Sequence, residues 1–130
     1  MTWVAGVILL SLIEYMVFGM LVARARGKYA VAAPAISGNP AFERYFRVQQ
    51  NTLEQLVVFI PAVWLFGLYV SAPWAAAIGA LFLIGRALYA MGYIAAPQKR
   101  EMGFVLSMIA QVILVLGALF GIVRPLLTHG

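Results

Sequence analysis

Residues 55–85 have the sequence QLVVFIPAVWLFGLYVSAPWAAAIGALFLIG and are the most informative segment about the fold. It contains no charged side chain, and Ser71, Ala72 and Pro73 form a short break within it. One membrane-crossing helix needs roughly 20 mainly apolar residues. The stretch therefore predicts two apolar helices that pack as antiparallel neighbours on either side of that break.

The composition of the whole chain is that of a membrane protein. Of its 130 residues, 65% are hydrophobic and 10% are charged, with a mean hydropathy of +0.98. A soluble domain is about 45–50% apolar and about 25% charged. We expect one all-α domain over residues 1–130, a four-transmembrane-helix bundle. The expected spans are residues 2–23, 42–69, 74–95 and 102–123.

Short connections join these spans and indicate how the chain is oriented. Pro34, Gly38 and Pro40 break the first connection, and Arg124 with Pro125 is expected to end the last span. Basic residues gather in the first and third connections and their flanks: Arg24, Arg26, Lys28, Arg44, Arg47, Lys99 and Arg100. The positive-inside rule places both connections in the cytoplasm and both termini on the opposite side. The first span is expected to be retained, because it lacks the basic region and cleavage site of a signal peptide.

Two spans are expected to carry polar stripes near this cytoplasmic end. Arg47, Asn51 and Glu54, with Gln50 beside them, have the spacing i, i+4 and i+7 of one helix face. In the third span, Arg86, Tyr89 and Tyr93 are similarly spaced. A charge at the depth of Arg86 costs a few kcal/mol unless it is paired or hydrated. Snorkelling of Arg86 and an interfacial belt for the tyrosines are the structural alternatives to a binding pocket.

The side chains of these stripes indicate the kind of ligand. The guanidinium groups of Arg47, Arg86 and Arg100 favour carboxylates, because they bind such groups with two hydrogen bonds. Glu54 suits an ammonium group, and Asn51 suits peptide amides. The set predicts a small, peptide-like zwitterion with net negative charge. Most metal sites are excluded, because the chain has no cysteine, one histidine and no carboxylate cluster.

Two blocks of residues resemble the signature of the MAPEG family, the membrane-associated proteins in eicosanoid and glutathione metabolism. The first block is Gly38-Asn39-Pro40, Phe42-Glu43-Arg44 and Arg47-x-Gln49-x-Asn51-x-x-Glu54. The second is Arg86-x-x-Tyr89-x-x-Gly92-Tyr93 followed by Arg100, and Arg26 matches a further basic position. The resemblance extends over the whole chain in length, number of spans and their order.

The resemblance implies a homotrimer that binds glutathione between neighbouring subunits near the cytoplasmic face. The residues implied to hold glutathione are Arg26, Arg47, Gln49, Asn51, Glu54, Arg86, Tyr89 and Tyr93. The resemblance also implies that Arg100 stabilises the glutathione thiolate, so that no cysteine of the protein is required. The other implied partners are membrane lipid and a hydrophobic electrophile or lipid hydroperoxide, with no nucleic acid and no metal cofactor. The expected activity is transferase, with peroxidase chemistry as a further possibility.

The chain departs from the leukotriene-synthase branch at two positions. Gln55 stands where that branch has a tyrosine, and Leu88 stands where it has an arginine, so an eicosanoid is not the expected substrate. Two other functions stay open. One is a non-catalytic lipid-binding scaffold of the same family. The other is a small proton-coupled multidrug transporter that uses Glu14, because an acidic residue inside a span is a functional candidate by default.

Overall fold

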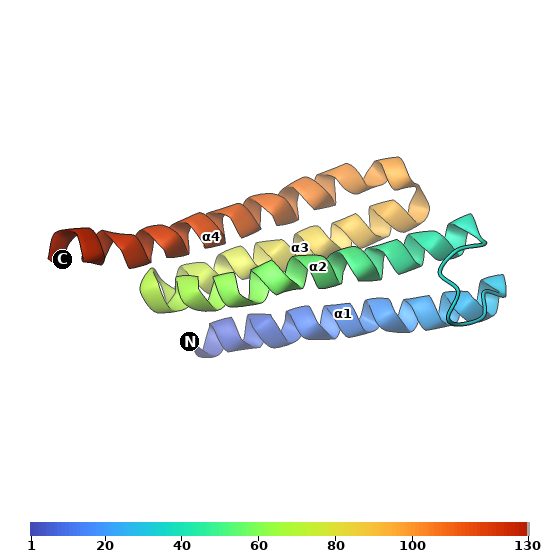
Figure 1. The fold of residues 1–130 in the computed structure, drawn as a ribbon, viewed down its shortest axis with the longest axis horizontal. Helices are drawn as coiled ribbons and strands as arrows, with labels where there is room; N and C mark the ends of the chain where they lie inside the picture. Colours follow the sequence, from blue (N-terminus) through green and yellow to red (C-terminus); the bar gives the residue numbers. More distant parts are fainter. Residues whose placement is uncertain (130) are drawn as a thin grey trace.

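The computed structural model describes residues 1–129, which form four long helices (Figure 1). The elements are α1 (Thr2–Tyr29), α2 (Pro40–Tyr69), α3 (Ala72–Ala95), the short 3-10 helix η1 (Pro97–Arg100) and α4 (Glu101–His129). All four long helices are long and apolar enough to cross a membrane. The predicted all-helical architecture with four membrane-spanning helices is thus confirmed.

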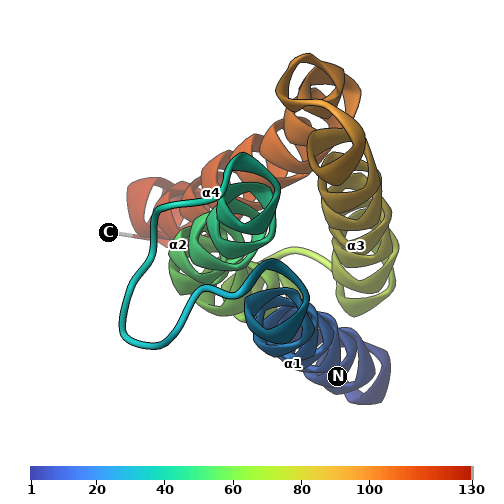
Figure 2. The same cartoon turned by 90° about the vertical axis from the view of Figure 1, so that its right-hand side faces the viewer.

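The chain runs up and down the bundle, so that α1 and α3 are parallel to each other and antiparallel to α2 and α4 (Figure 1). Helices α2 and α3 each contact both α1 and α4. Seen along the bundle, α1 lies on one side of the α2–α3 pair and α4 on the other (Figure 2). The first connection and η1 therefore lie at the same end of the molecule.

Helices α2 and α3 begin at polar caps. The Oδ1 atom of Asn39 accepts a hydrogen bond from the Phe42 amide at 3.0 Å, and Pro40 occupies the first turn of α2. The Oγ atom of Ser71 accepts one from the Trp74 amide at 3.3 Å, at the break between α2 and α3. Such side chains satisfy amides that the helix itself leaves without a partner, so they fix where each helix starts.

Two helices extend beyond the spans expected from hydropathy. Helix α1 continues through the basic residues after Ala23 to Tyr29, because positive charges suit the last turn of a helix. Helix α4 does not end at Arg124 and Pro125, where the last span was expected to end, but continues to His129. A proline removes only one helical hydrogen bond, and the Thr128 hydroxyl donates to carbonyl oxygens of that turn at 3.2 Å.

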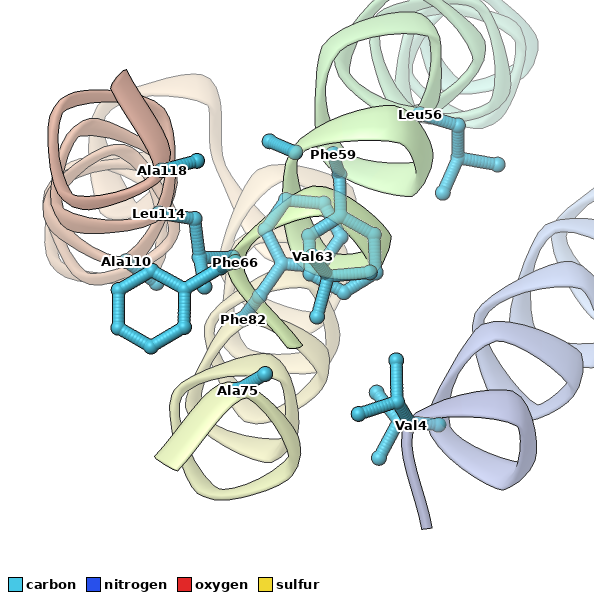
Figure 3. Packing of buried hydrophobic residues seen from close by; sticks show 12 residues of the cluster. Val4, Leu56, Phe59, Val63, Phe66, Ala75, Phe82, Ala110, Leu114 and Ala118 are labelled. Carbon is cyan, nitrogen blue, oxygen red and sulfur yellow. The ribbon is translucent and has the colours of Figure 1, made fainter. Parts of the chain in front are cut away.

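The core is an apolar cluster to which all four long helices contribute (Figure 3). At its centre the rings of Phe59 and Phe82 stack, with 3.9 Å between their centroids. Helices α3 and α4 approach closely beside it, because a Cβ atom added to Gly85 would lie 2.7 Å from the backbone nitrogen of Ser107. The outer faces also carry large exposed apolar side chains, such as Leu9 and Phe120, as expected for surfaces that meet lipid or another copy.

Candidate functional site

A polar pocket lies between α2, α3 and η1, at the end of the bundle that holds the first and third connections. Its volume is about 260 Å³, near the lower limit of about 300 Å³ for small-molecule sites. Its lining residues are Arg47, Gln50, Asn51, Glu54, Tyr89, Tyr93 and Arg100. Five of the eight residues implied to hold glutathione therefore lie together with Arg100.

One face of α2 supplies half of the pocket. Arg47, Asn51 and Glu54 line it at the helical spacing that the sequence predicts. Gln50 completes this face, although it was left out of the expected glutathione contacts. Its place beside Arg47 and Asn51 on the helix was the signal that could have included it, because residues three apart are neighbours on a helix surface.

Helix α3 and η1 supply the other half. The rings of Tyr89 and Tyr93 lie with their centroids 5.6 Å apart. The Arg100 guanidinium stands 5.4 Å from the centroid of the Tyr93 ring and donates through Nη1 to the Pro97 carbonyl at 3.2 Å. Gly92 permits this arrangement, because a Cβ atom there would overlap the Lys99 carbonyl. Without a side chain at this position, η1 folds back over the end of α3.

Arg86 lies beneath the pocket and does not line it. Its side chain is fully buried, at 0% exposure, and its Nη2 group donates to Asn51 Oδ1 and to Thr52 Oγ1, both at 2.8 Å. Its guanidinium carbon also lies 4.3 Å from the centroid of the Tyr89 ring. Because Asn51 Oδ1 accepts from Arg86, the amide nitrogen of Asn51 is the group left for a ligand. Arg86 thus orients two residues of the pocket from below.

Arg26 and Gln49 do not join this pocket. Arg26 donates through Nη1 to the Ala35 carbonyl at 2.6 Å and stacks over Phe42, at 4.9 Å from the ring centroid. It therefore holds the first connection against the start of α2. Gln49 lies against α1, where a Cβ atom on Gly19 would stand 3.1 Å from its Nε2 atom. Both side chains lie at the α1–α2 side of the bundle, away from the pocket.

The charges of the pocket suit an anionic organic ligand. Arg47 and Arg100 bring two positive charges, and Glu54 brings one negative charge. All three side chains are exposed, so a ligand can reach them. Guanidinium groups bind carboxylates in a planar, two-bonded geometry, whereas a single carboxylate suits an ammonium group. Among the side chains of residues 1–128, no group of three or more histidine, cysteine, aspartate or glutamate residues gathers to hold a metal.

Comparison with known proteins decides the family. The family described as MAPEG matches residues 4–120 of the chain. The chain belongs to the MAPEG family. It is 42% identical over 116 residues to human microsomal glutathione S-transferase 2, which covers 88% of this chain and 79% of that protein. The resemblance of the two polar blocks to MAPEG proteins is thereby confirmed.

Two further MAPEG-related sequences show how broad the similarity is. An uncharacterized protein of Synechocystis sp. is 48% identical over 124 residues, or 95% of this chain and 90% of that protein. Leukotriene C4 synthase of Cavia porcellus is 35% identical over 96 residues, or 74% of this chain and 64% of that enzyme. The MAPEG membership and the four membrane-spanning helices make this chain an integral, multi-pass membrane protein. The named relatives support a glutathione-related transferase role.

Proposed function

We propose that this MAPEG protein is a membrane-bound glutathione transferase that conjugates glutathione to hydrophobic electrophiles. The observation that carries the proposal is the convergence of Arg47, Asn51, Glu54 and Arg100 with two tyrosines in one pocket. These side chains come from two helices and from η1, so only the folded bundle assembles them. The named relatives support glutathione as the cosubstrate.

The pocket offers a complementary group for each part of glutathione. Arg47 would bind a carboxylate, and Glu54 would bind the ammonium group of the γ-glutamyl residue. The amide nitrogen of Asn51 and the hydroxyl of Tyr89 would hydrogen-bond the peptide part. The net positive charge of the pocket matches the net negative charge of the tripeptide at neutral pH.

Arg100 would stabilise the glutathione thiolate. A free thiol has a pKa of about 8.5, and the thiolate is the nucleophile. A nearby guanidinium lowers that pKa, and each unit of lowering corresponds to about 1.4 kcal/mol in favour of the anion. Arg100 is exposed and donates one hydrogen bond to Pro97, so the rest of its guanidinium is free to face the sulfur. The Tyr93 hydroxyl, close to Arg100, would be a second donor to the sulfur.

The thiolate would then attack an electrophile that arrives from the bilayer. In conjugation, a carbon–sulfur bond forms while the leaving group departs or a double bond is saturated. With a lipid hydroperoxide, the thiolate attacks the terminal peroxide oxygen, the O–O bond breaks, and the lipid leaves as an alcohol after taking up a proton, which gives the sulfenic acid of glutathione. A second glutathione then displaces water from this sulfenic acid and yields the disulfide. A largely apolar groove favours a lipid-side approach in either reaction. It is lined by Leu88, Met102, Val105, Leu106 and Ile109, together with Glu101, the residue after Arg100 in the chain. Holding both reactants together supplies the proximity that catalysis needs.

We further propose that the protein is a homotrimer with the site between subunits. The pocket of one chain is small and open, whereas Arg26 and Gln49 lie at the α1–α2 side of the same chain. Head-to-tail contacts can close into a ring, and in the proposed ring that side of one subunit would face the pocket of its neighbour. The first and third connections would be cytoplasmic, because seven basic residues lie in them and their flanks.

A turnover assay tests the proposed activity. The purified protein in lipid vesicles is given glutathione and a lipophilic aryl halide, and product formation is followed for the wild type, Arg47→Ala and Lys99→Ala. Arg47→Ala is expected to raise KM for glutathione about tenfold or more, because a hydrogen bond to a charged group contributes roughly 1.5 kcal/mol or more. Lys99→Ala, next to Arg100 but outside the pocket lining, is expected to match the wild type.

The alternatives predict different results in the same vesicles. A scaffold would bind lipid and show no glutathione-dependent turnover. A transporter would move a cationic compound in response to a proton gradient, and Glu14→Gln would abolish that movement. Either result, with no conjugation by the wild type, would contradict the transferase proposal.

A further inference from the structure

Glu14 is an acidic side chain within the first span that the proposed glutathione site does not use. It is half-buried on α1, on the helix face that also carries the buried residues Val7, Ser11 and Phe18. Glu14 follows Val7 by seven residues and Ser11 by three, and precedes Phe18 by four. Residues at these spacings lie along one side of a helix. Glu14 therefore belongs to the face of α1 that packs against the rest of the bundle.

The packing of α1 on α3 places Glu14 level with Arg86. Val7 lies against Gly79, where an added Cβ atom would stand 2.7 Å from Val7 Cγ1. Glu14 follows Val7 by seven residues on α1, and Arg86 follows Gly79 by seven residues on α3. The two helices are parallel (Figure 1). One turn further on, Phe18 packs with Tyr89 and Ala90. Contacts on both sides thus place Glu14 and Arg86 at the same level of the bundle.

Two nitrogen atoms of the Arg86 guanidinium lack a hydrogen-bond acceptor, which a carboxylate would provide. Its Nη2 group is fully engaged by α2, but Nε and Nη1 are buried and have no hydrogen-bond partner among the described residues. A buried charge that lacks a counter-charge is strongly disfavoured, and a long arginine side chain then tends to extend toward the membrane surface. Tyr89 covers one face of the guanidinium and offers a ring rather than a charge.

We infer that Glu14 is the counter-ion of Arg86 and, through it, a positioning residue for the pocket. The carboxylate on α1 holds the guanidinium at its depth between the helices. The guanidinium in turn holds Asn51 by its Oδ1 atom and supports the ring of Tyr89. Glu14 thereby couples α1 to the two helices that form the pocket without itself touching a ligand. The positioning role rests on the proposed glutathione site, whereas the charge pair does not.

Glutathione affinity and protein stability test the inference together. Glu14→Gln keeps the shape of the side chain and removes its charge, so it is expected to raise the glutathione Kd roughly tenfold and to lower Tm. Thiolate formation at saturating glutathione is expected to stay unchanged, because Arg100 is untouched. Glu14→Asp retains the charge and is expected to restore most of the affinity. An affinity for Glu14→Gln equal to that of the wild type would overturn the positioning role.

A double-mutant cycle shows whether Glu14 acts through Arg86. Adding Glu14→Gln to Arg86→Gln is expected to have no further effect on Kd or Tm, because the partner is already gone. Fully additive effects would overturn the pair. Ser11→Ala is the control for packing on the same face of α1, since its hydroxyl bonds only within its own helix, to the Ile8 carbonyl at 2.6 Å. Its glutathione Kd is expected to match the wild type.

The two readouts separate this inference from the proposed function. Absence of glutathione binding by the wild type would contradict the glutathione site and the positioning role with it. The pairing of Glu14 with Arg86 would then be tested by the Tm values alone. Non-additive losses of Tm in Glu14→Gln and Arg86→Gln would uphold the pair, and additive losses would refute it.

Discussion

Arg86 donates two hydrogen bonds from Nη2, and the partners Asn51 and Thr52 come from another helix. The bond to Asn51 reaches a residue of the pocket, whereas the bond to Thr52 stays entirely inside the bundle. The two partners therefore allow stability and ligand binding to be separated by single substitutions.

Thr52→Val tests the bond that lies inside the bundle. Valine has nearly the shape of threonine but leaves a buried donor of Arg86 without its acceptor. We expect the free energy of unfolding in detergent to fall by about 1–3 kcal/mol. Glutathione affinity should change much less, because Asn51 keeps its own bond to Arg86.

Ser107→Ala is the matched control for this substitution. Ser107 is also buried, but its hydroxyl donates to the Phe104 carbonyl of its own helix at 3.1 Å. Removing it leaves no buried donor without a partner, so the loss of stability should be smaller than for Thr52→Val. Equal losses in the two variants would argue against a structural role for the Arg86–Thr52 bond.

Helices α3 and α4 are the two elements whose packing depends most on close approach of their backbones. A Cβ atom on Gly103 would overlap the backbone of Tyr89, and one on Gly85 would press on Ser107. Helix α4 is thereby held against the part of α3 that carries the pocket tyrosines. Because η1 joins these two helices, their spacing also determines where Arg100 lies.

Gly103→Ala should push α4 away from α3 at the pocket. Overpacking of this kind costs typically about 1–3 kcal/mol of stability. We also expect lower turnover, because the displacement moves Tyr89 and Arg100 relative to each other. Gly6→Ala is the control, since nothing lies within 4 Å of a Cβ atom there. That variant should be neutral or slightly more stable, as alanine favours helix over glycine by about 1 kcal/mol. A stable and fully active Gly103→Ala variant would contradict a structural role for this close contact.

The sequence predicted those features that depend on local order along the chain. The uncharged stretch of residues 55–85 predicted two spans, and the predicted break at Ser71, Ala72 and Pro73 lies where α2 ends and α3 begins. Helical spacing predicted that Arg47, Asn51 and Glu54 share a face. The sequence did not predict that α4 continues past Pro125, because proline breaks helices in soluble proteins but is tolerated in a membrane helix.

The features that the sequence could not predict depend on packing between helices. The depth of Arg86 beneath the pocket follows from how α3 lies against α2, and spacing along α3 alone gave it the same role as Tyr89. Arg26 was grouped with the ligand contacts, yet within one chain it binds the first connection. In the proposed assembly, Arg26 and Gln49 would contact glutathione only in the pocket of a neighbouring subunit. Residue spacing along one chain does not reveal a contact of that kind.

At the scale of the whole molecule, the proposed assembly predicts that two defective subunits rescue each other. Arg47→Ala removes a pocket residue from its own subunit, and Arg26→Ala removes a group offered to the neighbouring pocket. In trimers formed from an equal mixture, about a quarter of the interfaces would combine an intact Arg47 with an intact Arg26. Co-expressed variants should therefore recover about a quarter of the wild-type turnover. Activity no higher than that of the separate variants would contradict a site shared between subunits.

The proposed function requires that this pocket binds glutathione and that Arg100 converts it to the thiolate. The most direct measurement is the ultraviolet difference spectrum of the thiolate when glutathione is added to the purified protein at neutral pH, for the wild type and for Arg100→Ala. The proposed function predicts a thiolate absorbance with the wild type that is lost with Arg100→Ala while glutathione still binds. A wild type that binds no glutathione, or an Arg100→Ala variant with the full thiolate signal, would contradict it.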